Sequence, residues 1–185
     1  MPPANSATPE HRRIAVFGGV YSNYLALAAA NNTWYPYSFM AETMMNEPAL
    51  SSALQALDRL VADVEARGIR REQIVLLGFS QGACLTAEFA VRGPARYGGI
   101  MIYSGGLIGA PGTTWDHPGS FDGTPVFLGC SDVDAHVPKV RVDESAEVFA
   151  RMGARVTERI YPGMGHLVND DEIVFTQSVM ARVLP

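Results

Sequence analysis

The residues best suited to catalysis lie in one short stretch around Ser80. Gly78, Ser80 and Gly82 form the pattern Gly-x-Ser-x-Gly, which follows an apolar run at residues 74–77 and precedes a segment with helical periodicity. This pattern is typical of a serine held on a sharp turn between a strand and a helix. Glycines on both sides let strand and helix approach closely, and the helix N-terminus favours negative charge developing beside the serine. The stretch therefore predicts a nucleophilic serine.

The elements that would position Ser80 alternate along the chain after residue 48. Helical periodicity is found at residues 50–64, 85–90, 142–152 and 170–184. Short apolar or alternating runs predict strands at residues 74–77, 99–103, 125–129 and 156–161. Helices that alternate with strands predict a largely parallel sheet covered by helices on both faces. A long segment without predicted elements, residues 109–124, is expected to be a functional loop or a cover.

The beginning of the chain has a less regular pattern. We expect residues 1–7 to be a poorly ordered lead-in. Thr8 as N-cap, with Pro9 and Glu10 in the first turn, favours a helix that runs towards Gly18. A strand at residues 14–17 is the competing interpretation.

An aromatic loop follows a short strand predicted at residues 24–27. Residues 34–39 are rich in aromatic side chains and are interrupted by a proline, so they do not suit a regular element. The loop could fill the core or form an apolar wall for a substrate, and the sequence favours neither. As substrate-lining residues we expect Trp34, Tyr35 and Phe79.

Polar residues follow three of the predicted strands at their carboxyl ends. Ser80 follows the first of these strands, Asp132 and Asp134 follow the second, and His166 follows the third. Active sites of open parallel sheets collect at these ends. The order Ser, Asp, His is that of the α/β-hydrolase triad. We expect His166 to take the proton of Ser80, and a carboxylate to fix the tautomer of the imidazole.

The other histidines do not fit this arrangement. His11 precedes the serine, His117 precedes the acidic loop, and His136 lies too close to Asp134 to arrive from a separate loop. The same reasoning does not separate Asp132 from Asp134. One is expected to be the triad acid, and the other to cap a turn or the following helix.

Composition argues against several classes of protein. A chain of 185 residues with 48% hydrophobic residues fits one domain with a sizeable core. The net charge of −5, without a run of Lys or Arg, argues against a nucleic-acid partner. No stretch has the length of a transmembrane helix or the pattern of a signal peptide, so a cytoplasmic protein is expected. Cys84 and Cys130 are expected to be buried free thiols.

Metal and cofactor sites are not expected. Two sets of side chains could be imagined as metal ligands, namely Asp132, Asp134 and His136, or His166, Asp170 and Asp171. Neither set has a recognised zinc or calcium spacing. Residues 105–106 form a glycine pair without the lysine and the spacing of a phosphate-binding loop.

Several motifs together carry a resemblance to a known family. They are Gly-Phe-Ser-Gln-Gly-Ala at residues 78–83, Asp134-x-x-Val137-Pro138, and Gly-Met-Gly-His at residues 163–166. These motifs resemble the phospholipase/carboxylesterase family of α/β-hydrolases, which includes the acyl-protein thioesterases. Asn-Thr-Trp-Tyr-Pro-Tyr at residues 32–37 looks like a bacterial branch of that family. The resemblance covers the chain from about residue 24 onwards.

The resemblance implies a fold and an activity. The fold would be a three-layer α/β-hydrolase sandwich with a mostly parallel sheet and no large cap domain, formed by residues 1–185 as one domain. The activity would be hydrolysis of small-molecule carboxylic esters or thioesters with small to medium acyl groups, through an acyl-serine, without metal or cofactor. Asp134 would be the triad acid, and the backbone N–H of Gln81 would be one oxyanion donor.

One feature of the family is missing from the sequence. Members begin with a strand that ends in a His-Gly-x-Gly type loop, which supplies the second oxyanion donor, and no such motif occurs here. Either residues 5–10 are the tail of that loop, or residues 16–19 replace the strand and loop. In the first case a sheet edge is left unpaired, and a homodimer would cover it. The alternative function is a catalytically impaired, hydrolase-fold binding protein.

Overall fold

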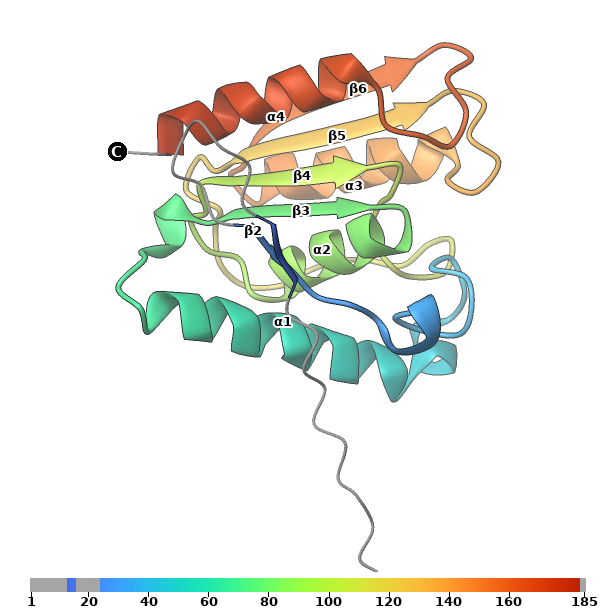
Figure 1. Cartoon of the computed structure of the whole chain (residues 1–185). Coiled ribbons are helices and arrows are strands. Elements are labelled where there is room, and N and C mark those ends of the chain that lie inside the picture. Colours follow the sequence, from blue (N-terminus) through green and yellow to red (C-terminus); the bar gives the residue numbers. More distant parts are fainter. Residues whose placement is uncertain (1–12, 16–23, 184–185) are drawn as a thin grey trace, which may run out of the picture.

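The computed structural model describes residues 13–15 and 24–183, and its central feature is a four-stranded parallel sheet in the order β3-β4-β5-β6 (Figure 1). The strands are β3 (Val75–Phe79), β4 (Gly99–Tyr103), β5 (Pro125–Ser131) and β6 (Arg155–Tyr161). The ends of β3 and β4 are level because Phe79 pairs with Tyr103, and those of β5 and β6 because Ser131 pairs with Tyr161. Tyr103 pairs with Gly129, so β5 extends slightly beyond β4. This alignment brings the loops that follow the strands to one edge of the sheet, as the sequence predicts.

Helices cover both faces of the sheet. On one face lie α2 (Gln81–Arg92) and α3 (Lys139–Arg151), and on the other lies α4 (Asp170–Val183). The side chains of β4 alternate accordingly. Ile100 and Ile102 belong to the larger core, whereas Met101 and Tyr103 pack in a second core with Val179 of α4. The helix α1 (Ala49–Glu65) packs on α2. The three layers predicted from the sequence are therefore confirmed.

The start of the described chain corrects one prediction. Strand β1 (Arg13–Ala15) pairs antiparallel with β2 (Tyr24–Ala26), although a helix was expected through the first of these segments. The competing strand interpretation agrees with the structure at residues 14–15, and the remainder of both interpretations lies outside the described residues. Pairing with the next strand decides the conformation here, and a capping pattern within residues 8–10 carries no information about that pairing.

Short 3₁₀ helices connect the larger elements. They are η1 (Ala30–Asn32), η2 (Thr43–Asn46) and η3 (Arg71–Gln73). The aromatic residues 34–39 form a loop without helix or strand, as predicted. Residues 109–124 also form neither helix nor strand.

The loop after β4 is held by a buried arginine of α3. Arg141 donates hydrogen bonds from Nη1 to the carbonyl oxygens of Leu107 and Gly109, both at 2.8 Å. Its guanidinium lies over the ring of Trp115, 5.1 Å from the centroid. Ser145 Oγ accepts the N–H of Leu107 at 2.9 Å. These bonds make the first half of the loop a fixed part of the fold.

A second buried charged group, Glu172, lies in the first turn of α4. Its Oε2 accepts the N–H of Asn169, and the Asn169 side chain accepts the N–H of Glu172, which caps the helix reciprocally. A Cβ added to Gly129 of β5 would lie only 2.0 Å from Glu172 Oε1, so the carboxylate occupies the space that this glycine leaves open. Burial, with a smaller contribution from the neighbouring Asp171 carboxylate, raises the pKa of Glu172 above its ordinary value.

We expect Glu172→Gln to weaken the dependence of stability on pH. Between the unfolded-state pKa, about 4.3, and the raised folded-state pKa, the folded protein holds a proton that the unfolded chain releases. The free energy of unfolding therefore falls as pH rises through this window. Glutamine still accepts the Asn169 N–H but does not titrate. Urea unfolding at pH 4 and pH 8 measures the difference, with the exposed Glu42→Gln as control. An equal change in both variants would contradict the prediction.

Candidate active site

Ser80 occupies a strained turn between β3 and α2. Its backbone has φ 55° and ψ −125°, in the region that favours glycine. A Cβ on Gly78 would lie 2.3 Å from the carbonyl oxygen of Gly82, so β3 and α2 approach too closely for any larger residue at position 78. A Cβ on Gly82 itself would meet no atom closer than 4.0 Å. The close approach inferred from the sequence thus requires the first glycine but not the second.

The structure brings the Ser80, His166 and Asp134 side chains into one hydrogen-bonded chain. His166 Nε2 lies 2.9 Å from Ser80 Oγ, and His166 Nδ1 lies 2.8 Å from Asp134 Oδ2. Asp134 Oδ1 accepts the backbone N–H groups of His136 at 2.8 Å and Val137 at 3.0 Å. This geometry can pass a proton from the hydroxyl to the imidazole while the carboxylate fixes the ring.

The electrostatic environment keeps the Asp134 carboxyl ionised. Burial alone would raise its pKa, but the hydrogen bond with His166 and the two backbone N–H groups outweigh burial and hold the pKa below its ordinary value. Cys130 lies beneath the carboxylate, with Sγ 3.7 Å from Asp134 Oδ2. Burial raises the pKa of the Cys130 thiol to about 12, so this group stays neutral beside the carboxylate.

The two aspartates that the sequence left unseparated have different partners. Asp134 contacts His166, whereas Asp132 Oδ1 accepts the N–H of Gly163 at 2.7 Å. Asp132 therefore caps a turn in the loop that carries His166. Capping a turn was one of the roles expected for the aspartate that is not the triad acid.

Two aromatic rings lie against His166. The Phe79 ring centroid is 5.0 Å from that of His166, and the His136 ring meets His166 edge-on at 4.7 Å. Phe79 is 41% exposed and can also contact a substrate. His136 does not fit the triad by its position in the sequence, and its contact with His166 was not predicted. The His136 N–H donates to Asp134 Oδ1, and this turn brings the His136 ring next to His166. The short separation of His136 from Asp134 in the sequence could have predicted this contact.

The Gln81 side chain anchors the aromatic loop beside Ser80. Its Oε1 accepts the N–H of Trp34, and its Nε2 donates to the carbonyl oxygen of Tyr35, both at 2.8 Å. Tyr35 is only 2% exposed and belongs to the larger core, so it fills space beneath the loop and does not line an open site. Trp34 is partly buried, and together with Phe79 it remains available to a substrate.

The backbone N–H of Gln81 lies at the positive end of the α2 dipole. Gln81 is the first residue of α2, directly after Ser80. The first N–H groups of a helix have no partner within the helix, and they carry its partial positive charge. Residues 16–19, the candidate source of a second donor, lie outside the described part of the chain.

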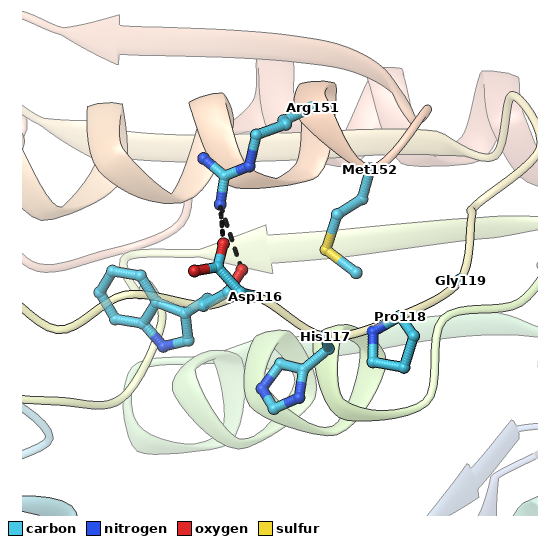
Figure 2. A pocket seen from close by; sticks show the side chains of 7 residues that line it. Asp116, His117, Pro118, Gly119, Arg151 and Met152 are labelled. Atoms are coloured by element: carbon cyan, nitrogen blue, oxygen red, sulfur yellow. Dashed lines mark hydrogen bonds and ion pairs between the residues drawn. The ribbon is translucent and has the colours of Figure 1, made fainter.

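A surface hollow of about 350 Å³ lies elsewhere in the molecule (Figure 2). It is lined by Trp115, Asp116, His117, Pro118, Gly119, Arg151 and Met152. Arg151 is 3.6 Å from the Asp116 carboxylate and also donates to the carbonyl oxygen of Trp115. Because its cation and anion neutralise each other and no triad residue lines it, this hollow offers no comparable chemistry.

Other features of the described residues bear on possible ligands. Cys84 and Cys130 are buried free thiols, as expected. Within residues 13–15 and 24–183, no group of three His, Cys, Asp or Glu side chains is placed to hold a metal ion. The helices of the same part of the chain are all too short or too polar to cross a membrane.

Proteins of known structure share the fold of this chain. A solved phospholipase/carboxylesterase from Dyadobacter fermentans is 47% identical and superposes with a TM-score of 0.77, over 84% of this chain and 73% of the other. A SOBER1 variant from Arabidopsis thaliana, 20% identical with a TM-score of 0.67 over 82% and 74% of the two chains, shares the fold. The fold is that of the α/β-hydrolases.

The family follows from the sequence match. The model of the family described as Phospholipase/Carboxylesterase matches residues 3–183, and the chain belongs to this family. Acyl-protein thioesterase 1 of Saccharomyces cerevisiae is 32% identical over 137 residues, which are 72% of this chain and 60% of the yeast protein. The chain thus spans about three-fifths of the length of this curated relative.

Proposed function

We propose that this protein is a serine hydrolase that cleaves carboxylic esters or thioesters of small to medium acyl groups. The observation that carries the proposal is the unbroken hydrogen-bonded chain from Ser80 through His166 to Asp134, at a strained turn before a helix. The names of its relatives, acyl-protein thioesterase and phospholipase/carboxylesterase, support the same class of reaction.

The first half of the reaction transfers the acyl group to Ser80. His166 Nε2 takes the hydroxyl proton while Oγ forms a bond to the carbonyl carbon. The carbonyl oxygen becomes an oxyanion, which the Gln81 N–H stabilises. When the tetrahedral intermediate collapses, the bond to the leaving alcohol or thiol breaks, and the imidazolium gives that group its proton. Asp134 stabilises the imidazolium through Nδ1.

The second half releases the acid. Water takes the position of the leaving group, loses a proton to His166 Nε2, and attacks the acyl carbon. Collapse of the second intermediate breaks the bond to Ser80 Oγ, which recovers its proton from His166. The balance is one water consumed for each carboxylic acid and each alcohol or thiol released, without any oxidant or cofactor.

The surroundings of Ser80 support an apolar acyl group. Trp34 and Phe79 lie on the elements that directly adjoin the nucleophile, and each keeps part of its ring accessible. Aromatic walls with few charges suit an acyl chain. A protein that only binds its partner would have no use for an assembled base and orienting acid, so the impaired-enzyme alternative is not favoured.

Labelling with a fluorophosphonate tests the nucleophile. We expect attack by Ser80 Oγ to form a P–O bond with loss of fluoride, giving one adduct on Ser80 that mass spectrometry can locate. The matched control is Ser52→Ala, which changes an exposed serine and should leave the labelling of Ser80 unchanged. A series of p-nitrophenyl esters from acetate to palmitate then tests acyl length, with turnover expected to fall for the long chains. Folded protein that remains unlabelled and hydrolyses none of the esters would overturn the proposal.

A further inference from the structure

The loop that carries His166 is tied to the carboxyl end of β5 at two points. Asp132 Oδ1 accepts the N–H of Gly163 at 2.7 Å, and Ser131 Oγ accepts the N–H of Gly165 at 2.9 Å. The strand pairing leads directly into these bonds, since the Asp132 N–H donates to the carbonyl oxygen of Tyr161 at 3.3 Å. Ser131 and Asp132, at the carboxyl end of β5, therefore bind Gly165 and Gly163 in the loop that carries His166.

Packing gives these two points of the loop little support. Gly163 and Gly165 have φ values of 68° and 78°, and a Cβ added to either would find no atom within 4 Å. Glycine in this region has more conformational freedom than other residues. Two other hydrogen bonds reach this loop, from Asn169 Nδ2 to Met164 Sδ at 2.9 Å and from the Leu167 N–H to the Gly165 carbonyl oxygen at 3.2 Å. The bonds from β5 are those that hold the N–H groups of Gly163 and Gly165 to the sheet. The bond from a carboxylate is charge-assisted and is the stronger type.

The structure assigns Asp132 as a positioning residue of the active site. Its carboxylate fixes the turn at Gly163, and this turn places His166 Nε2 against Ser80 Oγ. The two neighbouring carboxylates then have separate tasks: Asp134 orients the imidazole ring, and Asp132 orients the backbone that carries the ring. This inference rests on the proposed function, because the effect of positioning is read through the activity of Ser80.

The consequence is a loss of turnover without a loss of substrate binding. Misplacement of a catalytic group by about 1 Å can reduce the rate by roughly 100-fold. Asp132 is exposed, and Ser131 still holds the loop two residues further on. We therefore expect Asp132→Ala to lower kcat for a p-nitrophenyl ester by roughly 10- to 100-fold while KM changes by less than about twofold.

The experiment compares three variants with the wild type in one ester assay. Asp132→Asn keeps an acceptor oxygen for Gly163 and is expected to retain most of kcat. Asp58→Ala, which removes an exposed carboxylate from α1, should match the wild type. Hydrogen exchange gives a readout independent of activity: the Gly163 amide should exchange faster in Asp132→Ala, with the amides paired between β5 and β6 unchanged.

The outcomes separate this inference from the proposed function. Wild-type protein that turns over no ester would remove the proposed function, whatever the variants do. Active wild type with an equally active Asp132→Ala would overturn the positioning role, as would a rise in KM at constant kcat. Equal losses in Asp132→Asn and Asp132→Ala would also contradict it, because only one of these changes removes the acceptor.

Discussion

Replacement of Ser80 by alanine is expected to lower kcat/KM for p-nitrophenyl acetate by roughly 10⁴- to 10⁶-fold. The hydroxyl is the atom that forms the acyl bond, and His166, 2.9 Å from it, has no proton to accept once it is gone. The fold should survive, because the backbone N–H of Ser80 still donates to the carbonyl oxygen of Tyr103. Steady-state kinetics with burst titration of active sites measures the loss. A variant that retains a tenth of the wild-type rate would exclude Ser80 as the nucleophile.

The matched variant Ser80→Gly separates chemistry from backbone strain. A non-glycine residue held in such a region costs about 1–3 kcal/mol. Alanine keeps this strain, whereas glycine removes it. The gain in stability from glycine is partly offset because glycine has more conformational freedom in the unfolded chain. Both variants should be inactive, but only Ser80→Gly should be more stable than the wild type, by about 1 kcal/mol in urea unfolding. Equal stability of the two would show that the turn stores little strain.

The meeting of Ser80, Asp134 and His166 could be expected from the sequence because the relevant information is local to each loop. Residue types that can act as nucleophile and base follow separate strands, and a parallel sheet collects the ends of those strands. The choice between Asp132 and Asp134 is different, since both belong to one loop after β5. The structure separates them by a turn in which Asp134 Oδ1 takes two backbone N–H groups, so that Oδ2 faces His166. The direction of a side chain in such a turn cannot be derived from spacing alone.

The features that were predicted wrongly depend on contacts outside the segment itself. Strand β1 is defined by pairing with β2, and burial of Tyr35 depends on packing against the larger core. By contrast, β4 was predicted with its observed limits because all five of its residues are buried and apolar or small. Helix α3 begins at Lys139, three residues before the first apolar position of the predicted helix. Its first turn reverses the usual pattern, because the apolar Val140 is exposed and the charged Arg141 is buried.

Asp134→Asn is expected to reduce kcat by roughly 10³- to 10⁴-fold with little change in KM. The asparagine carbonyl can replace Oδ1, where it accepts the N–H groups of His136 and Val137. Its amide nitrogen must then face His166 Nδ1, which lies 2.8 Å from Oδ2 in the wild type. Facing a donor, Nδ1 has to be the acceptor, and the ring proton moves to Nε2. A histidine protonated at Nε2 cannot take the proton of Ser80.

The neighbouring substitution Asp132→Asn supplies the control for this argument. It makes the same chemical change two residues away, but its partner is a backbone N–H, which accepts no proton and needs only an acceptor oxygen. Asp132→Asn should therefore stay close to wild-type turnover while Asp134→Asn loses nearly all of it, measured by kcat at pH 8 with one ester. Similar losses in both variants would mean that negative charge in this loop matters more than the tautomer of His166. A large difference instead identifies the proton on Nδ1 as the property that Asp134 maintains.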